Sequence, residues 1–238
     1  MNDTITVAAR YRGPEGAGNG GYCAGLLAER IEGDAVVRLS ASIPLETPLR
    51  FVREDGRERL CRSDDGMVLA EAWHEPLEFD VLPAPDDGHL DRMTAAFSRA
   101  PNGPFAHCFG CGEARGPDDS IRVLSGRLPG ESLCGSRWRP HAAFAGPDGA
   151  LAPRYVWTAL DCTGGLAVEP LDERPVMTGT MHGRVLTPVH AGEDHTVIGW
   201  PIGKDSRKIV TGTAIYGADG VLKAVARSIW IALQPDKA

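Results

Sequence analysis

Two stretches of the chain place apolar residues at the spacing of an α-helix. The first follows Asn19, whose side chain is typical of a helix N-cap, and stops near Gly33. The second follows Pro153, a residue that suits the first helical position, and stops before Pro170. The apolar positions are Tyr22, Leu26, Leu27 and Ile31 in the first stretch, and Val156, Trp157, Leu160, Gly164 and Val168 in the second. The pattern therefore predicts one helix in each half of the chain.

After each predicted helix, the pattern changes to the alternation of apolar and polar residues that is typical of strands. Asp65-Gly66 and Asp219-Gly220 suit tight turns between such strands. The predicted strands span residues 35–43, 48–53, 57–62 and 67–74, then 176–186, 194–201, 207–217 and 220–233, with one more before each helix near 4–11 and 120–138. One helix with about five mostly hairpin-connected strands, found twice, indicates an α+β fold.

An internal repeat divides the chain into two similar halves. Residues 65–72 read DGMVLAEA and residues 219–226 read DGVLKAVA, an offset of 219 − 65 = 154. A second similarity aligns Pro44 with Pro188, and each of these prolines follows an alternating apolar run. Two such similarities that occur in the same order along the chain indicate a duplication.

The 238 residues are enough for two domains of ordinary size. We predict a first domain at 1–82, a linker at 83–104 and a second domain at 105–238. The linker is rich in Pro, Asp and Gly and encloses a short helical candidate, LDRMTAAFSRA.

Composition narrows the classes of function. The net charge of 25 − 32 = −7 argues against a general nucleic-acid or anionic-membrane binder. The start, MNDTITVAAR, does not resemble a secretory signal, and no apolar run approaches the ~18 residues that span a bilayer. Six scattered cysteines fit reduced thiols. We therefore expect a cytoplasmic protein with neither nucleic-acid nor membrane partners.

Two glycine- or cysteine-rich motifs have competing interpretations. Gly16, Gly18 and Gly21 formally match a dinucleotide-binding pattern, but neither the preceding strand nor the later acid is in place. These glycines either direct helix N-terminal N–H groups at a ligand oxygen or form a plain turn.

Cys108 and Cys111 supply only two metal ligands, and Cys134 and His141 are the nearest others. We therefore expect no metal, and a turn that enters the second domain.

Asp161 is unusual because Asp is a poor residue for the middle of a helix. It borders the apolar stripe, where a carboxylate is partly desolvated unless a polar group meets it. A solvated Asp at the edge of the stripe is the alternative. Gly164 and Gly165 weaken the same helix, so we expect another backbone to pass close to them.

CFGCG, the alternating strand after it, a Trp-x-Pro segment and a helix with a central Asp resemble PaaI-type hotdog thioesterases. The two-copy layout and the final segment ARSIWIAL resemble TesB-type double-hotdog acyl-CoA thioesterases. The resemblance implies a double hotdog, in which each of two central helices is wrapped by an antiparallel β-sheet. It also implies hydrolysis of acyl-CoA, a small-molecule substrate, with no cofactor beyond the coenzyme A of that substrate.

The family places His-Gly-Gly at the helix start and a catalytic Asp nine residues after that His. Here the first half keeps Gly20 and Gly21 but has Ala28 at the acid position. The second half keeps Asp161 but has Pro153 in place of a glycine. Because the family builds its site across two domains, the resemblance implies one composite site from these two halves.

By the same resemblance, the Gly20 and Gly21 N–H groups polarise the thioester carbonyl. Asp161 acts as general base or nucleophile, and Thr178 steadies the water. The expected substrate-binding residues are Asn19, Tyr22, Trp157, Lys204, Arg207 and Lys208. The last three would meet the phosphates of coenzyme A, although basic surface residues usually bind nothing specific.

Asn19 replaces the family's His, and this departure keeps a second class of function open. A non-catalytic acyl-CoA- or lipid-binding hotdog protein would bind acyl-CoA without releasing a thiol. A hotdog hydratase would need a His five residues after the Asp, where this chain has Leu166. The sequence does not decide whether the protein is a homo-oligomer.

Overall fold

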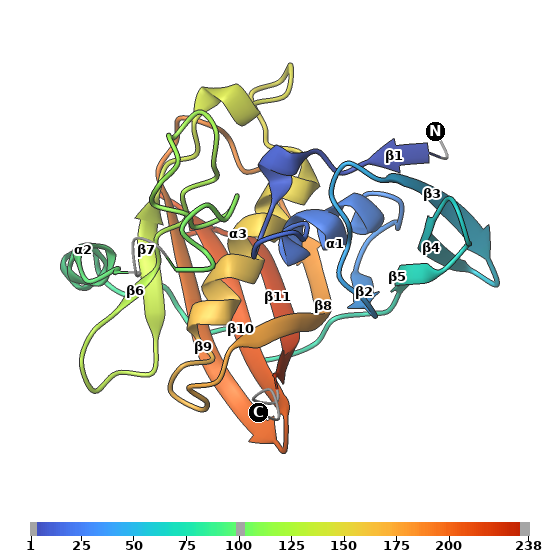
Figure 1. Ribbon diagram of the computed structural model, residues 1–238. Helices are drawn as coiled ribbons and strands as arrows, with labels where there is room; N and C mark the ends of the chain where they lie inside the picture. Colours follow the sequence, from blue (N-terminus) through green and yellow to red (C-terminus); the bar gives the residue numbers. More distant parts are fainter. Residues whose placement is uncertain (1–3, 99–102, 234–238) are drawn as a thin grey trace.

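The computed structural model describes residues 4–98 and 103–233, and its strands form one antiparallel sheet with helices against it (Figure 1). The elements of the first half are β1 (Thr4–Thr6), the 3-10 turn η1 (Ala9–Tyr11), α1 (Gly20–Ala28), β2 (Ala35–Leu39), β3 (Pro48–Glu54), β4 (Arg57–Arg62) and β5 (Val68–His74). After α2 (Asp87–Ala95), the second half contains β6 (Gly126–Arg127), β7 (Cys134–Trp138), η2 (Ala142–Phe144), α3 (Pro153–Leu166), β8 (Val176–Val185), β9 (His195–Asp205), β10 (Lys208–Gly217) and β11 (Leu222–Ala232). The fold class is α+β.

The order of the strands is symmetrical about the centre of the sheet. It runs β1-β3-β4-β5-β2-β8-β11-β10-β9-β7-β6. β2 and β8 pair at the middle, and outward from them β5 corresponds to β11, β4 to β10 and β3 to β9. The Asp65-Gly66 turn between β4 and β5 therefore corresponds to the Asp219-Gly220 turn between β10 and β11.

Both main helices begin where the sequence predicts. Asn19 caps α1 by accepting a hydrogen bond from the Tyr22 N–H at 2.8 Å, and Pro153 is the first residue of α3. α1 ends at Ala28, before the predicted stop at Gly33. The prediction of one strand over 120–138 is only partly correct: a turn at Gly130, with φ +81°, separates the short strands β6 and β7.

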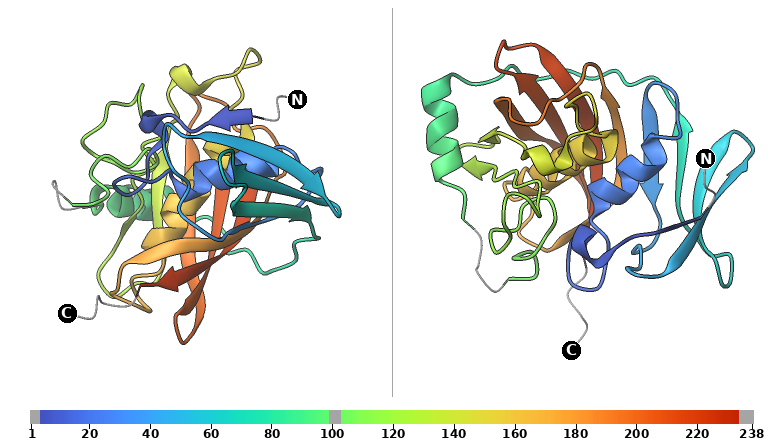
Figure 2. Two further views of the ribbon diagram at one scale, coloured as in Figure 1. Left: turned by 45° about the vertical axis from the view of Figure 1, so that its right-hand side comes forward. Right: turned by 90° about the horizontal axis from the view of Figure 1, so that it is seen from above.

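α1 and α3 lie antiparallel and side by side on one face of the sheet (Figures 1 and 2). Two glycines of α1 allow this approach, because a Cβ at Gly21 or Gly25 would lie less than 3.0 Å from backbone atoms of α3. The expectation that Gly164 and Gly165 face another backbone is wrong. A Cβ at these positions would instead meet the ring of Trp230, at 3.1 and 3.3 Å.

The opposite face of the sheet is covered by the chain that follows β5. Leu77 packs with Trp200 and Tyr216, and the Tyr216 hydroxyl donates a hydrogen bond to the Leu82 carbonyl at 2.5 Å. The helix predicted in LDRMTAAFSRA is present as α2, which starts a few residues earlier and packs against β7. None of the described helices is both long and apolar enough to cross a bilayer.

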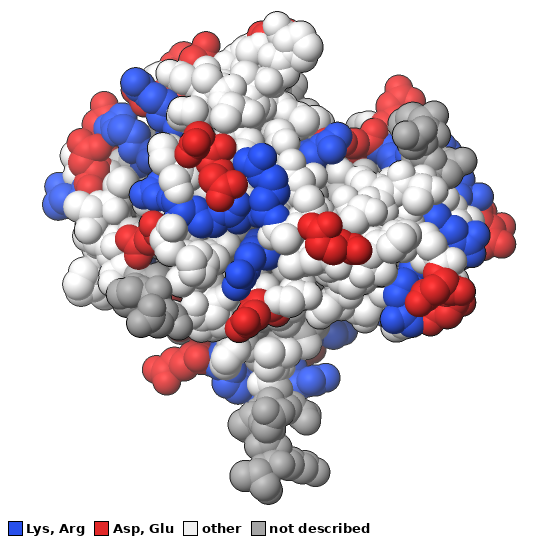
Figure 3. Space-filling model, turned by 45° about the horizontal axis from the view of Figure 1, so that its top comes forward, with Lys and Arg blue, Asp and Glu red and all other residues white. Residues whose placement is uncertain are grey.

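Charged side chains of both signs are interspersed on the face that carries the N-terminal loops. Figure 3 shows lysine and arginine side chains beside aspartate and glutamate side chains there, with broad uncharged areas between them. This face therefore presents charges of both signs.

Candidate active site

Asp161 is the centre of the candidate site, because its carboxylate joins three elements. The residue lies on α3 and is only 4% exposed. Its Oδ2 accepts a hydrogen bond from the Gly21 N–H at the start of α1, at 2.9 Å. Its Oδ1 accepts one from the Thr178 hydroxyl of β8, at 2.8 Å. Both carboxylate oxygens are thus fixed in position.

The start of α1 accepts this carboxylate because its first residues have no side chains. A Cβ at Gly20 would lie 2.6 Å from the Thr178 Oγ1, and one at Gly21 would lie 2.5 Å from the Trp157 carbonyl oxygen. The first N–H groups of a helix have no partner within the helix and lie at the positive end of its dipole. The two glycines therefore expose main-chain donors to Asp161 and to anything beside it.

Burial changes the acidity of this carboxyl group. Loss of water around Asp161 raises its pKa to about 7, although the bonds from Thr178 and from the Gly21 N–H act in the opposite direction. A group with such a pKa exchanges protons near neutral pH, which is a common property of catalytic acids and bases.

A cavity of about 620 Å³ opens beside the carboxylate. Asn19, Gly20, Asp161 and Thr178 line it together. Its apolar wall includes Leu39, Ile43, Leu166, Val168, Met177, Trp230 and Ile231. Glu169, Asp172, Glu173 and Arg174 add charged side chains to the lining. An apolar wall of this kind suits a ligand with an apolar chain, and the polar and charged groups beside it can fix the ligand's orientation.

The start of α3 has a carboxylate too, but its surroundings differ. Glu29, just after α1, accepts a hydrogen bond from the Arg154 N–H at 3.0 Å. The Arg154 guanidinium also donates two bonds to the same carboxylate, at 2.8 and 2.6 Å. Among the described residues that line the cavity, neither Ala28 nor Pro153 is present.

The remaining residues singled out in the sequence fall into three places. Asn19 is buried beneath the cavity, where it caps α1. Tyr22 and Trp157 lie in the hydrophobic core and are not part of the cavity lining. The Lys204 ammonium contacts Asp172 at 3.1 Å, and Asp172 lines the cavity.

Arg207 and Lys208 lie further along the hairpin between β9 and β10, outside the described lining of the cavity. The structure thus brings together Asp161, Gly20, Gly21 and Thr178, and separates the basic residues from them.

Sequence reasoning missed two sets of residues. The first is the Glu29–Arg154 pair, because nothing in the sequence links residues 125 positions apart. The second is Cys162, whose sulfur lies beside those of Cys108 and Cys111. No sequence signal joins Cys162 to the other two cysteines, because it lies 54 positions from Cys108.

Hydrogen bonding perturbs the Cys108 thiol. The thiols of Cys111 and Cys162 and the backbone N–H groups of Cys111 and Gly110 hydrogen-bond to its sulfur, and they hold its pKa well below the usual range.

Comparison with known proteins identifies the fold. No protein-family model matches the chain, and no curated protein matches it in sequence. Solved structures do match. An acyl-CoA thioesterase II from Mycobacterium marinum aligns with a TM-score of 0.60 at 14% identity, covering 99% of this chain and 94% of the other.

Two further solved structures align with the chain over nearly its full length. The tesB protein of Mycobacterium avium subs paratuberculosis has a TM-score of 0.60 at 12% identity, covering 97% of this chain and 92% of its own. A protein of unknown function with a hot dog fold from Alicyclobacillus acidocaldarius has a TM-score of 0.54 at 13% identity, covering 98% and 93%. The chain therefore has the hot dog fold, over nearly its full length, in common with proteins named as thioesterases.

Proposed function

We propose that this protein is an acyl-CoA thioesterase with one composite active site, built as a double hotdog whose repeats lie in residues 1–82 and 105–238. The observation that carries the proposal is the buried Asp161 carboxylate of α3, bound by the Gly21 N–H of α1 and the Thr178 hydroxyl. Base and main-chain donors thus come from different halves and meet at one cavity.

In the proposed reaction, the acyl chain occupies the apolar part of the cavity. The thioester carbonyl oxygen accepts a hydrogen bond from the Gly20 N–H, which stabilises the charge that develops on it. Asp161 takes a proton from the attacking water, the C–S bond breaks, and the proton passes to the departing coenzyme A thiolate. In the alternative route, Asp161 attacks the carbonyl carbon itself and displaces the thiolate, and water then hydrolyses the resulting anhydride. Thr178 was expected to steady the water, but its hydroxyl donates to Asp161, so in this proposal it holds the carboxylate in the required orientation.

The two glycines have different tasks in this proposal. The family resemblance implies that both N–H groups bind the carbonyl oxygen, but the Gly21 N–H donates to Asp161. Gly21 therefore positions the base, and Gly20, which lines the cavity, is left to polarise the substrate.

For the coenzyme A portion we retain Lys204, Arg207 and Lys208 as the proposed phosphate ligands. Lys204 is bound to Asp172, which lines the cavity, so this side chain lies near the cavity. The other two continue along the same hairpin, where a long nucleotide tail could extend.

The decisive experiment measures thiol release from a panel of acyl-CoAs by wild type and by Asp161→Asn. Hydrolysis that Asp161→Asn abolishes supports the proposal. The second candidate, an acyl-CoA-binding protein without turnover, is favoured by the engaged Gly21 N–H and by Asn19 in place of the family's His. Saturable binding of acyl-CoA without thiol release would select that candidate.

A further inference from the structure

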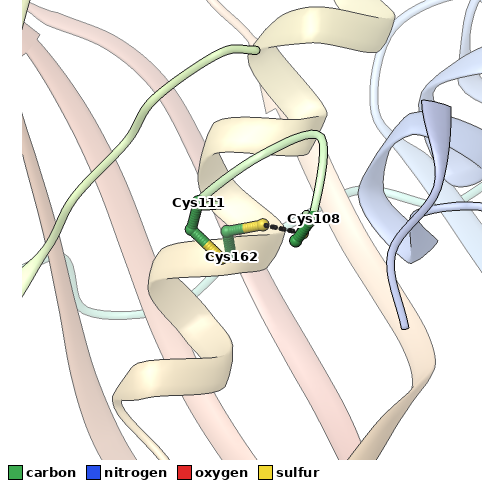
Figure 4. Close-up of side chains that lie close together, drawn as sticks. All are labelled: Cys108, Cys111 and Cys162. Carbon is green, nitrogen blue, oxygen red and sulfur yellow. Dashed lines mark hydrogen bonds between the residues drawn. The ribbon is translucent and has the colours of Figure 1, made fainter. Parts of the chain in front are cut away.

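Three cysteines lie close together (Figure 4), and all three line the cavity. Cys108 and Cys111 come from the loop that precedes β6, and Cys162 comes from α3. Their sulfur atoms lie within 4.8 Å of one another, and those of Cys108 and Cys162 are 3.8 Å apart. All three residues are buried, with exposed fractions of 2%, 1% and 7% in that order.

Close backbone packing builds this arrangement. The Gly112 N–H donates to the Cys108 carbonyl at 2.9 Å, which closes the loop into a tight turn. A Cβ at Gly112 would lie 2.6 Å from that carbonyl oxygen, and a Cβ at Gly110 would lie less than 3.0 Å from the Cys162 sulfur. The two glycines therefore let the loop press its sulfur atoms against α3.

The spacing of the sulfur atoms fits a metal site. A tetrahedral zinc ion with Zn–S bonds of about 2.3 Å requires its sulfur ligands to be about 3.8 Å apart. A disulfide requires about 2.05 Å. The separation of 3.8 Å between Cys108 and Cys162 matches the first value and is far from the second.

Hydrogen-bond donors surround the sulfur atoms, as they do around metal-bound thiolates. The Asn19 amide nitrogen lies 3.5 Å from the sulfur of Cys108 and 3.5 Å from that of Cys162. Backbone N–H groups of Gly110 and Cys111 also donate to Cys108. The Asn19 amide thus lies within reach of two of the three sulfur ligands before a cation arrives.

We propose that Cys108, Cys111 and Cys162 bind one zinc ion, whose fourth coordination position faces the cavity. All three residues line that cavity, so water or a small thiol could reach the ion. Thiolate ligands select thiophilic ions, and zinc needs no change of oxidation state to bind. The sequence predicted no metal because Cys108 and Cys111 supply only two ligands, and the nearest further ligands along the chain were Cys134 and His141. Instead Cys134 donates to the Thr163 and Gly199 carbonyls, and His141 caps η2.

The test begins with the full chain, expressed with added zinc and purified without chelator. We expect elemental analysis to give about one zinc ion per chain for wild type and near zero for Cys162→Ser. Cys134→Ser is the matched control, because it also removes a buried thiol but should keep the ion. Equal zinc content in Cys162→Ser and wild type would overturn the proposal.

A second measurement does not depend on whether the variant folds. Wild type is stripped of metal and titrated with Co²⁺, whose thiolate complexes show sulfur-to-metal charge-transfer bands. We expect the bands to reach their maximum at about one equivalent and to disappear when Zn²⁺ is added. A chain that binds neither ion, or mass spectrometry that finds a disulfide among the three cysteines in the purified protein, would contradict a zinc site.

Discussion

The N-termini of α1 and α3 have the same backbone arrangement, but the donors that surround the bound carboxylate differ in charge. At each one, a main-chain N–H donates to a carboxylate from the other helix segment: Gly21 to Asp161 at 2.9 Å, and Arg154 to Glu29 at 3.0 Å. At α1 the neighbouring donors are neutral, whereas at α3 a guanidinium holds the carboxylate with two further bonds.

Under the proposed function, this difference separates a catalytic carboxylate, Asp161, from a structural one, Glu29. Burial raises the pKa of Asp161 to about 7, and its carboxyl group faces a cavity. The Glu29 carboxylate instead accepts two hydrogen bonds from the Arg154 guanidinium. The α3 end has Pro153 and Arg154 where the α1 end has Gly20 and Gly21, and under the proposed function only the α1 end is open to a substrate.

The largest expected effect is on turnover in Asp161→Asn. The change keeps the size of the side chain and removes its charge, so the general base is lost. We expect hydrolysis of the preferred acyl-CoA to fall by about 10²–10⁴-fold, with the thermal midpoint nearly unchanged. Steady-state thiol release is the measurement. If full turnover remains, Asp161 is not the base and the two helix ends do not differ in the way proposed.

Thr178→Val should have the next largest effect. Valine is close in shape but cannot donate to the Asp161 Oδ1, so the carboxylate loses one of its two fixed bonds. We expect turnover to fall about 10- to 100-fold, the range for a lost hydrogen bond to a charged group. The same thiol-release assay measures it, and Thr178→Ser, which keeps the hydroxyl, should recover most of the rate.

Gly25→Ala tests the contact that brings the two helix ends together. Its Cβ would lie less than 3.0 Å from the Arg154 Cα, so the helices must move apart. We expect a loss of about 1–3 kcal/mol in the free energy of unfolding, measured with denaturant. Gly165→Ala is the control, because its Cβ would meet only the Trp230 ring at 3.3 Å. Equal losses in both variants would show that the helix–helix contact is not specially tight.

Glu29→Gln should have the smallest effect and should leave turnover unchanged. The Arg154 side chain is 33% exposed and that of Glu29 19%, so water can partly replace the lost charge interaction. We expect a loss of about 1 kcal/mol in the free energy of unfolding, from denaturant titration. A large fall in thiol release would instead mean that both helix ends take part in catalysis.

Much of the fold could be predicted because its signals are local. Asn19 and Pro153 marked the helix starts, and alternation marked most strands within a few residues. The strand over 120–138 was predicted too long, since alternation does not reveal where a turn such as that at Gly130 interrupts pairing. To predict the order of the strands, one would have to know that β2 pairs with β8, and no local pattern in the sequence indicates that pairing.

The site was harder to predict because its contacts are not local. Asp161 stood out as a mid-helix carboxylate, but the resemblance, not spacing, linked it to Gly20 and Gly21. The role of the paired glycines of α3 was misjudged, because a glycine can make room for a ring as well as for a backbone. The thiol of Cys162 lies 54 positions from Cys108 in sequence, so no motif joins them.

The central pairing of β2 with β8 also has consequences for the folding and handling of the protein. Each half, expressed alone, would lose the pairing of Ala35–Arg38 with Thr180–Gly183 and would leave N–H and C=O groups without partners at the edge of its sheet. Unprotected edges of this kind recruit further strands and lead to aggregation. A proteolytic cut between the halves is therefore tolerable while they remain associated, whereas separate fragments would be expected to self-associate or precipitate.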